Sequence, residues 1–257
     1  IYSTALPSPM RRKCHDKSLE DSCVYNSGSQ MVVTFGDSHT TELSYSISKI
    51  LEKKNIRVHQ LSKGDCIPLV IDSENKNMSY LQNCSKWLEK GLAYIRNQPD
   101  ISDVVISFRM PYHLFGDQLK TYPKFPAERT LRERQFIWRS YIGILKELKD
   151  SGKKVHLVLS SPELPSEPAN IIFTRFVSKQ GKYNGVSKNW FNERNKYIYS
   201  REREYLGIAD FVYDPSVEFC DRKYCYLNDE AGSYYFDDDH MSVYGSGIIA
   251  SLIVKNI

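Results

Sequence analysis

Short apolar runs alternate with amphipathic segments along most of this chain, and this alternation constrains the fold more than any other feature of the sequence. After the first run, Leu43, Ile47 and Leu51 recur at helical spacing and predict a helix. The runs have the length and composition of buried strands, and we expect five of them, at Met31–Phe35, Ile56–Leu61, Val104–Phe108, Val155–Leu159 and Ile208–Tyr213. Strands that alternate with helices form a mostly parallel sheet that is covered on both faces. The sequence therefore predicts an α/β fold, a three-layer α/β/α sandwich around a mostly parallel five-stranded sheet.

The length of 257 residues suits one large domain with an embellishment. Residues 1–29 show little periodicity, so we expect an N-terminal extension that packs on a main domain over residues 30–257. Residues 161–206 are more than a simple crossover requires. We expect an insert there, with a proline-rich loop followed by one polar helix over residues 186–206.

The charge pattern excludes a nucleic-acid partner. The net charge is only +4, and lysine and arginine are scattered rather than clustered. No stretch approaches the ~20 apolar residues of a membrane helix. The chain begins at Ile1 without an initiator methionine or a signal peptide, so we expect a mature form or a part excised from a longer protein.

An even number of cysteines suggests disulfide bonds, although sequence alone does not choose among the many pairings. Because short loops cost least to close, we expect the pairs Cys14–Cys23, Cys66–Cys84 and Cys220–Cys225. The alternative is six reduced thiols in a cytosolic enzyme; a zinc site is less favoured because no CxxC is present. Disulfides belong to oxidising compartments, so these pairs point to the periplasm or the cell exterior.

The motif Gly36-Asp37-Ser38-His39 directly follows the first apolar run. It places Ser38 at the carboxyl end of a strand, the edge where open α/β sheets bind ligands. A helix that begins there aims unpaired backbone N–H groups at the ligand, so Ser38 suits both a nucleophile and an oxyanion-hole donor. The alternative is an ordinary N-cap serine.

A second motif, Asp237-Asp238-Asp239-His240, lies near the C-terminus. Asp237 has the spacing to reach the histidine Nδ1 and fix its tautomer, whereas we expect Asp238 and Asp239 not to have this reach. With Ser38, these residues supply a nucleophile, a base and an orienting acid for acyl transfer. Two alternatives remain: a solvated acidic loop in which His240 caps the last helix, and a metal site built from the three aspartates and His240.

The remaining histidines and the tyrosine pair near the second motif are weaker candidates. We expect His39 to pack or cap. The other four histidines lack an acidic partner at useful spacing, and we interpret them as structural or surface residues: His15, His59, His113 and His156. Tyr234-Tyr235 suits stacking on sugars, but buried packing is the favoured use.

Here the sequence resembles the SGNH (GDSL-like) hydrolase superfamily over residues 30 to 257. It is most similar to the SGNH domains fused to membrane-bound acyltransferase-3 proteins, which include bacterial O-antigen O-acetyltransferases. Gly36-Asp37-Ser38-His39 matches the first block of the family and Asp237-x-x-His240-x-Ser242 the last, and the cysteines also resemble that subgroup. The resemblance implies a flavodoxin-like α/β/α sandwich and a catalytic triad of Ser38, Asp237 and His240. It also implies a periplasmic domain tethered to the inner membrane.

The same resemblance implies an oxyanion hole completed by a glycine after the second strand and an asparagine after the third. Gly64 suits the first role. The third strand is followed by Ser107-Phe108-Arg109-Met110-Pro111, with no asparagine. Arg109 lies near that position, and we weigh an oxyanion donor or a binder of a charged acyl donor or glycan against a plain surface arginine.

Together these features predict a serine-dependent O-acetyltransferase domain that modifies a bacterial surface polysaccharide, such as the O-antigen of lipopolysaccharide. We expect no metal and no organic cofactor in this domain. The acetyl group is expected to arrive through a membrane-embedded acyltransferase-3 domain of the same polypeptide. The alternatives are a stand-alone carbohydrate esterase with the same triad, and a non-catalytic glycan-binding module.

Overall fold

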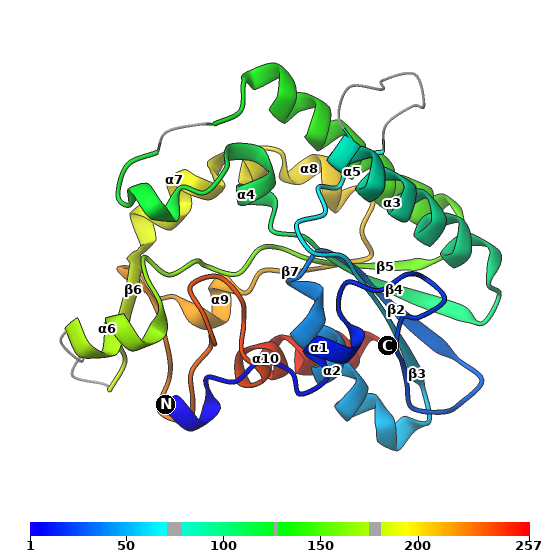
Figure 1. Cartoon of the computed structure of the whole chain (residues 1–257), viewed down its shortest axis with the longest axis horizontal. Helices are drawn as coiled ribbons and strands as arrows, with labels where there is room; N and C mark the ends of the chain where they lie inside the picture. Colours follow the sequence, from blue (N-terminus) through cyan, green and yellow to red (C-terminus); the bar gives the residue numbers. More distant parts are fainter. Residues whose placement is uncertain (71–78, 126–127, 175–180) are drawn as a thin grey trace.

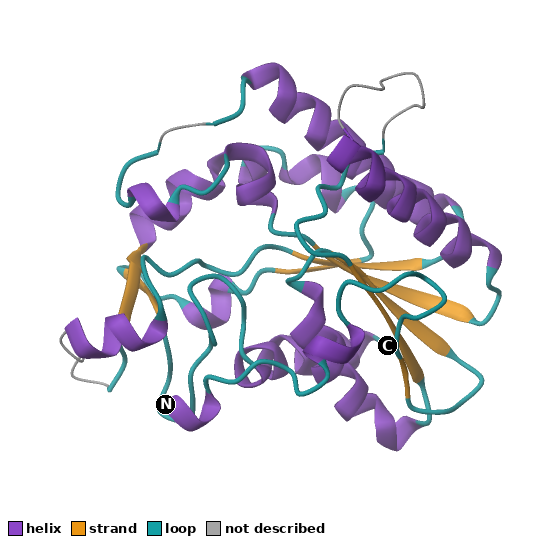
Figure 2. Ribbon diagram, in the orientation of Figure 1, coloured by secondary structure: helices purple, strands orange, loops and turns teal. Residues whose placement is uncertain are grey.

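The computed structural model describes residues 1–70, 79–125, 128–174 and 181–257. Its centre is a six-stranded sheet with the strand order β1-β3-β2-β4-β5-β7. All neighbouring strands pair in parallel except β1, which runs antiparallel to β3 at one edge. The strands are β1 (Val24–Tyr25), β2 (Met31–Gly36), β3 (Arg57–Ser62), β4 (Ile101–Ser107), β5 (Lys154–Val158) and β7 (Phe211–Tyr213). Helices cover both faces of this sheet, which confirms the predicted α/β sandwich (Figures 1 and 2).

The sheet has one strand more than the five that the sequence predicts. The additional strand, β1, comes from the N-terminal segment and contributes only two residues, Val24 opposite His59 and Tyr25 opposite Val58. A strand this short has no periodicity to detect, because alternation needs about four residues or more to be visible. The N-terminal segment is therefore part of the sheet.

Two hydrophobic cores lie on opposite faces of the sheet because successive side chains of a strand point to opposite sides. Val33 and Phe35 of β2 pack with α3 (Ser79–Asn97) and α5 (Leu131–Asp150). Val32, the residue before Val33, packs with α2 (Thr40–Leu51) and α10 (Val243–Ile253). The other helical segments are η1 (Tyr2–Thr4), α1 (Arg11–Cys14), η2 (Glu52–Lys54), α4 (Met110–Phe115), η3 (Leu119–Thr121), α6 (Pro168–Thr174), α7 (Lys188–Tyr199), α8 (Glu202–Leu206), α9 (Ser216–Phe219) and η4 (Val254–Asn256).

The insert over residues 161–206 differs from its prediction; its residues 175–180 lie outside the described part of the chain. The single polar helix expected over residues 186–206 is wrong. The segment contains a strand, β6 (Asn184–Ser187), which pairs with β8 (Tyr224–Tyr226), and then the separate helices α7 and α8. Ser187 caps α7 by accepting a hydrogen bond from the Trp190 backbone N–H at 3.2 Å. The sequence does not reveal these boundaries, because the segment is charged throughout and neither glycine nor proline marks them.

All three predicted disulfides are present: Cys14–Cys23, Cys66–Cys84 and Cys220–Cys225. The first closes the N-terminal segment, and the second ties the loop after β3 to α3. Among the described residues, no helix combines the length and apolarity needed to cross a membrane.

The carboxyl ends of the central parallel strands meet at one edge. Gly36 at the end of β2 lies in register with Ser62 of β3 and Ser107 of β4. The loops that follow these strands, together with the segment before α10, build the site described next.

Candidate active site

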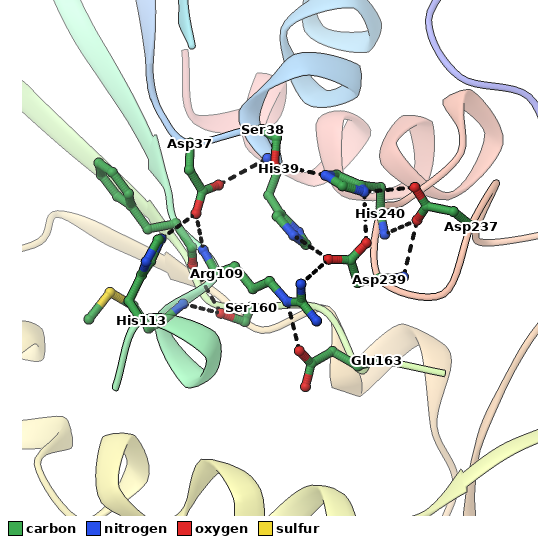
Figure 3. Close-up of polar contacts among 12 residues, drawn as sticks. Asp37, Ser38, His39, Arg109, His113, Ser160, Glu163, Asp237, Asp239 and His240 are labelled. Atoms are coloured by element: carbon green, nitrogen blue, oxygen red, sulfur yellow. Dashed lines mark hydrogen bonds and ion pairs between the residues drawn. The ribbon is translucent and has the colours of Figure 1, made fainter. Parts of the chain in front are cut away.

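Ser38 lies in the tight connection between β2 and α2. Gly36 is required there, because a Cβ would lie 1.8 Å from the Ser107 carbonyl oxygen and 2.3 Å from Thr40 Oγ1. The N-cap of α2 is His39, so the Ser38 hydroxyl does not cap the helix. Instead, Ser38 Oγ lies 2.8 Å from His240 Nε2 (Figure 3). The N-cap alternative for this serine is therefore wrong.

His240 joins Ser38 to Asp237. Asp237 Oδ2 lies 2.8 Å from His240 Nδ1, and Asp237 Oδ1 accepts the His240 backbone N–H at 2.6 Å and the Asp239 backbone N–H at 3.1 Å. The carboxylate is thus fixed by its own loop while it holds the imidazole. The structure brings the three residues of the predicted triad into one hydrogen-bonded series, with Nε2 directed at the serine.

A second carboxylate approaches the same imidazole nitrogen. Asp239 Oδ1 lies 2.7 Å from His240 Nδ1, and Asp239 is only 6% exposed. The expectation that Asp237 alone has this reach is therefore wrong: the loop turns back on itself, which sequence spacing does not reveal. Burial opposes protonation of His240, but the hydrogen bonds and charges of Asp237 and Asp239 outweigh it and raise the pKa of His240 to about 10. Burial would raise the pKa of Asp239, but its hydrogen bonds with His240 and His39 hold it well below its usual range.

Aromatic rings fix the orientation of His240. Its ring stacks on His39 at 4.5 Å and on Phe236 at 5.5 Å between centroids. His39 is buried and donates its backbone N–H to Asp37 Oδ1 at 2.9 Å. His39 thus has the packing role that the sequence suggests, and its place beside His240 also links the two motifs directly.

Asp37 anchors the nucleophile turn to the loop after β4, a role that the sequence did not reveal. Asp37 Oδ2 accepts the Arg109 backbone N–H at 2.6 Å and lies 2.8 Å from His113 Nε2. Burial alone would raise the pKa of Asp37, but the His113 hydrogen bond and the neighbouring histidines hold it at about 2. His113 therefore has an acidic partner, far away in sequence. The fixed anion keeps the turn that carries Ser38 in place.

Arg109 lies in a network of buried charges. Its Nε donates to Glu163 Oε1 at 2.8 Å, its Nη1 pairs with Asp239, and its guanidinium lies 4.8 Å from the centre of the Tyr112 ring. Glu163 also binds Arg194 of α7, whose Nη2 donates to Oε1 at 2.8 Å. Arg109 is thus not a plain surface residue. Its expected role as an oxyanion donor stays a prediction, since the guanidinium faces carboxylates in these contacts.

The other expected oxyanion donors lie at the same edge. No described residue accepts a hydrogen bond from the Ser38 backbone N–H. Gly64 follows β3 and is half-buried, and a Cβ on it would lie 3.5 Å from His15 Nε2. Whether either group binds an oxyanion stays a prediction.

The metal alternative has candidate ligands in the described residues. His39, Asp239 and His240 form one group with suitable spacing, and Asp237, Asp238 and Asp239 form another. However, Asp239 belongs to both groups and already pairs with the Arg109 guanidinium. A cation there would face that positive charge at close range, which disfavours binding. The arrangement suits proton transfer between Ser38 and His240 better than metal ligation.

Comparisons with known proteins identify the family and the fold of the chain. The family model described as SGNH domain (fused to AT3 domains) matches residues 12–255. Among solved structures, the periplasmic domain of a lipopolysaccharide acetyltransferase from Salmonella ser. Paratyphi A aligns with a TM-score of 0.63 and 15% sequence identity. The alignment covers 95% of this chain and 90% of that one, and at this identity it shows a shared fold. No curated protein matches the sequence.

Proposed function

The chain belongs to the family of SGNH domains that are fused to AT3 domains, and from this premise we propose that it transfers acetyl groups through Ser38 to hydroxyls of a bacterial surface polysaccharide. The observation that carries the proposal is the hydrogen-bonded series from Asp237 through His240 to Ser38. The same constellation serves acyl transfer on several unrelated folds.

Two steps follow from this geometry. Ser38 Oγ attacks the carbonyl carbon of the acyl donor, its proton passes to His240 Nε2, and the C=O electron pair moves onto the oxygen. Collapse of this intermediate expels the leaving group, which takes the proton from His240 and leaves an ester on Ser38. A sugar hydroxyl then attacks the ester carbon and gives its proton to His240. The second collapse returns that proton to Ser38 Oγ and releases the acylated sugar.

The negative oxygen formed in each step needs hydrogen-bond donors. The Ser38 backbone N–H is the first donor that we propose, since it opens the connection to α2. Gly64 and Arg109 are further donors in the proposed set. Asp237 and Asp239 stabilise the imidazolium that forms on His240.

The acceptor, the donor and the location are the finer parts of the proposal. The AT3 fusion of the family supports a membrane-embedded acyltransferase domain of the same polypeptide as the source of the acetyl group. Three disulfides favour an oxidising compartment, and we place the domain in the periplasm, tethered to the inner membrane. The Salmonella protein is named as a lipopolysaccharide acetyltransferase, which makes O-antigen the acceptor to test first.

Acetylation in cells tests the proposal. The full-length protein with Ser38→Ala is expected to lose polysaccharide O-acetylation, measured by NMR of the extracted polysaccharide. Ser251→Ala is the matched control, because Ser251 is an exposed serine on α10 whose hydroxyl donates to the Ile248 carbonyl of the same helix. Normal acetylation with Ser38→Ala would refute the serine mechanism and favour a glycan-binding module.

A second measurement separates transfer from hydrolysis. The acyl-serine formed on the isolated chain is detected by mass spectrometry after reaction with an activated acetyl ester. If added polysaccharide accelerates loss of this ester and becomes acetylated, the domain is a transferase. If water alone removes it at the same rate and the polysaccharide stays unmodified, the stand-alone esterase is the better interpretation.

A further inference from the structure

His15, in the N-terminal segment, lies beside the candidate active site. Its Nδ1 lies 3.2 Å from Thr41 Oγ1 and 3.1 Å from Ser62 Oγ. Thr41 is one helical turn after Ser38, and Ser62 ends β3 in register with Gly36. The Cys14–Cys23 disulfide begins at the residue before His15. The imidazole is therefore held at the strand edge that presents the nucleophile.

The hydrogen bonds around His15 determine which ring nitrogen carries the proton. Tyr25 Oη donates to Gln60 Oε1 at 2.8 Å, so the Gln60 amide nitrogen faces Ser62 and donates to Ser62 Oγ at 2.8 Å. Ser62 then has its own O–H to donate, and His15 Nδ1 is the acceptor at 3.1 Å. This arrangement favours the neutral tautomer that carries its proton on Nε2.

His15 stays neutral at physiological pH. Burial, followed by the nearby Arg11, lowers the pKa of His15 to about 4. The Nε2–H group is thus a permanent neutral donor.

This donor lies near Gly64, where the expected oxyanion hole lacks a hydrogen-bond donor. Nε2 lies 3.5 Å from where a Cβ on Gly64 would be, and no described residue accepts its proton. The chain has no asparagine after β4, only Arg109 turned toward carboxylates. The asparagine donor that the resemblance implies is therefore missing.

We propose that His15 Nε2–H donates a hydrogen bond to the acyl carbonyl oxygen as this oxygen becomes negative, so that the N-terminal segment completes the oxyanion hole. This inference rests on the proposed function. His15 is then a catalytic residue, since it contacts the reacting oxygen. Loss of a single oxyanion donor lowers kcat by roughly 100-fold in other enzymes.

The test uses the 257-residue chain with p-nitrophenyl acetate as the acyl donor. His15→Ala is expected to lower kcat roughly 100-fold with little change in KM, because the donor acts on the transition state. His15→Gln, whose side-chain amide carries an N–H near the position of Nε2, is expected to recover most of the loss. The second readout is the rate at which a fluorophosphonate labels Ser38. Labelling needs no turnover, and its product is tetrahedral at phosphorus, like the intermediate of acyl transfer at carbon.

His59→Gln is the matched control. His59 is also a buried histidine next to the N-terminal segment, with Ser22 Oγ at 2.6 Å and Tyr94 Oη at 3.0 Å, and its pKa is likewise lowered to about 4, by burial first and then by Arg57. This variant is expected to change the melting temperature but not kcat. Ser38→Ala is measured in parallel.

Three outcomes overturn the inference. If Ser38→Ala is inactive while His15→Ala keeps full kcat and labelling rate, His15 is not a donor and the proposed function stands. If His15→Gln is as impaired as His15→Ala while both variants unfold at the normal temperature, a hydrogen-bond donor at this position is not what the reaction needs. If Ser38→Ala retains activity, the proposed function fails together with this inference.

Discussion

At the scale of single residues, the unusual feature is an imidazole with two carboxylates at one nitrogen. Asp237 and Asp239 approach His240 Nδ1 at 2.8 and 2.7 Å, and Asp239 also neutralises Arg109. Two anions favour the imidazolium, which stabilises the protonated intermediate of each step but leaves less of the neutral base that starts it. The balance between these effects sets the working pH.

The pH dependence follows from that balance. Because the reaction needs neutral His240 and its pKa is raised to about 10, kcat/KM is expected to rise with pH up to about 10. Asp239→Asn removes one anion, so the midpoint is expected to move to lower pH. Asp238→Asn is the control, since no contact joins Asp238 to the imidazole. An identical midpoint in Asp239→Asn and the unchanged protein would show that Asp239 does not act on His240.

The triad residues are predicted to act as one catalytic unit, so that activity is lost when Ser38 or His240 is replaced. Ser38→Ala and His240→Ala are each expected to reduce ester hydrolysis to the same low level, because members of a catalytic unit do not contribute additively. Asp237→Asn is expected to be less severe than either, since Asp239 still approaches Nδ1. Steady-state kinetics of the three variants, with circular dichroism as the folding control, measure this order. A loss with Asp237→Asn equal to that with His240→Ala would contradict the support from Asp239.

The candidate site was predictable at these residues because both motifs are local. Asp237 and His240 are neighbours in one loop, and Ser38 follows a strand that its own composition reveals. The contacts of Asp37 with His113 and of His15 with Thr41 join residues far apart in the chain. Only the folded sheet edge creates such contacts, so sequence spacing carries no signal for them.

At the scale of elements, α7 is joined to the catalytic loop by charge. Arg194 of α7 is 1% exposed; it binds Glu163, which binds Arg109, which pairs with Asp239. The insert is thereby connected to His240 through alternating charges. The buried strands were predictable to within a few residues, whereas β1 and β6 are too short to show a pattern and charged α7 conceals its buried arginine.

Removing Arg194 is predicted to destabilise the fold. Arg194→Ala leaves Glu163 buried with Arg109 as its remaining ion-pair partner and deprives Gln118 of its 2.7 Å hydrogen bond. Because a broken buried pair leaves charge uncompensated, we expect a loss on the order of 3 kcal/mol in the free energy of unfolding, measured by urea denaturation. Arg203 is exposed on α8, and Arg203→Ala is the control. We expect this variant to change the free energy of unfolding by less than about 0.5 kcal/mol. Equal effects would show that the pair with Glu163 contributes nothing.

At the scale of the whole molecule, the site depends on segments from both ends of the chain. Residues from the loops after β2, β4 and β5 and from the segment before α10 meet around Ser38 (Figure 3). From the N-terminal segment, His15 Nδ1 lies 3.2 Å from Thr41 Oγ1. Two disulfides hold segments at this edge: Cys14–Cys23 closes the N-terminal segment, and Cys66–Cys84 ties the loop after β3 to α3. This convergence follows from the parallel sheet, which the alternation in the sequence predicts, although the order of the strands required the structure.

The disulfides are predicted to differ in their effect on activity. Replacing Cys14 and Cys23 by serine is expected to cost about 2–3 kcal/mol of stability by the chain-entropy model and to lower kcat, because it releases His15. Replacing Cys220 and Cys225 is expected to lower stability without lowering kcat, because this pair closes the connection from α9 to β8. Thermal unfolding and ester hydrolysis of both double variants provide the comparison. Equal kcat in the two double variants would show that the N-terminal segment does not contribute to catalysis.

Strand β1 also protects the protein from self-association through the edge of its sheet. It covers one side of β3 through only two residue pairs, Val24 with His59 and Tyr25 with Val58, supported by the hydrogen bond from the Gln60 N–H to the Cys23 carbonyl. Without it, β3 would be an uncovered edge strand, and such edges recruit strands from neighbouring molecules into mixed sheets. Strand β1 thus protects the protein from aggregation, and a shortened chain beginning at Ser29 would be expected to precipitate as it is concentrated.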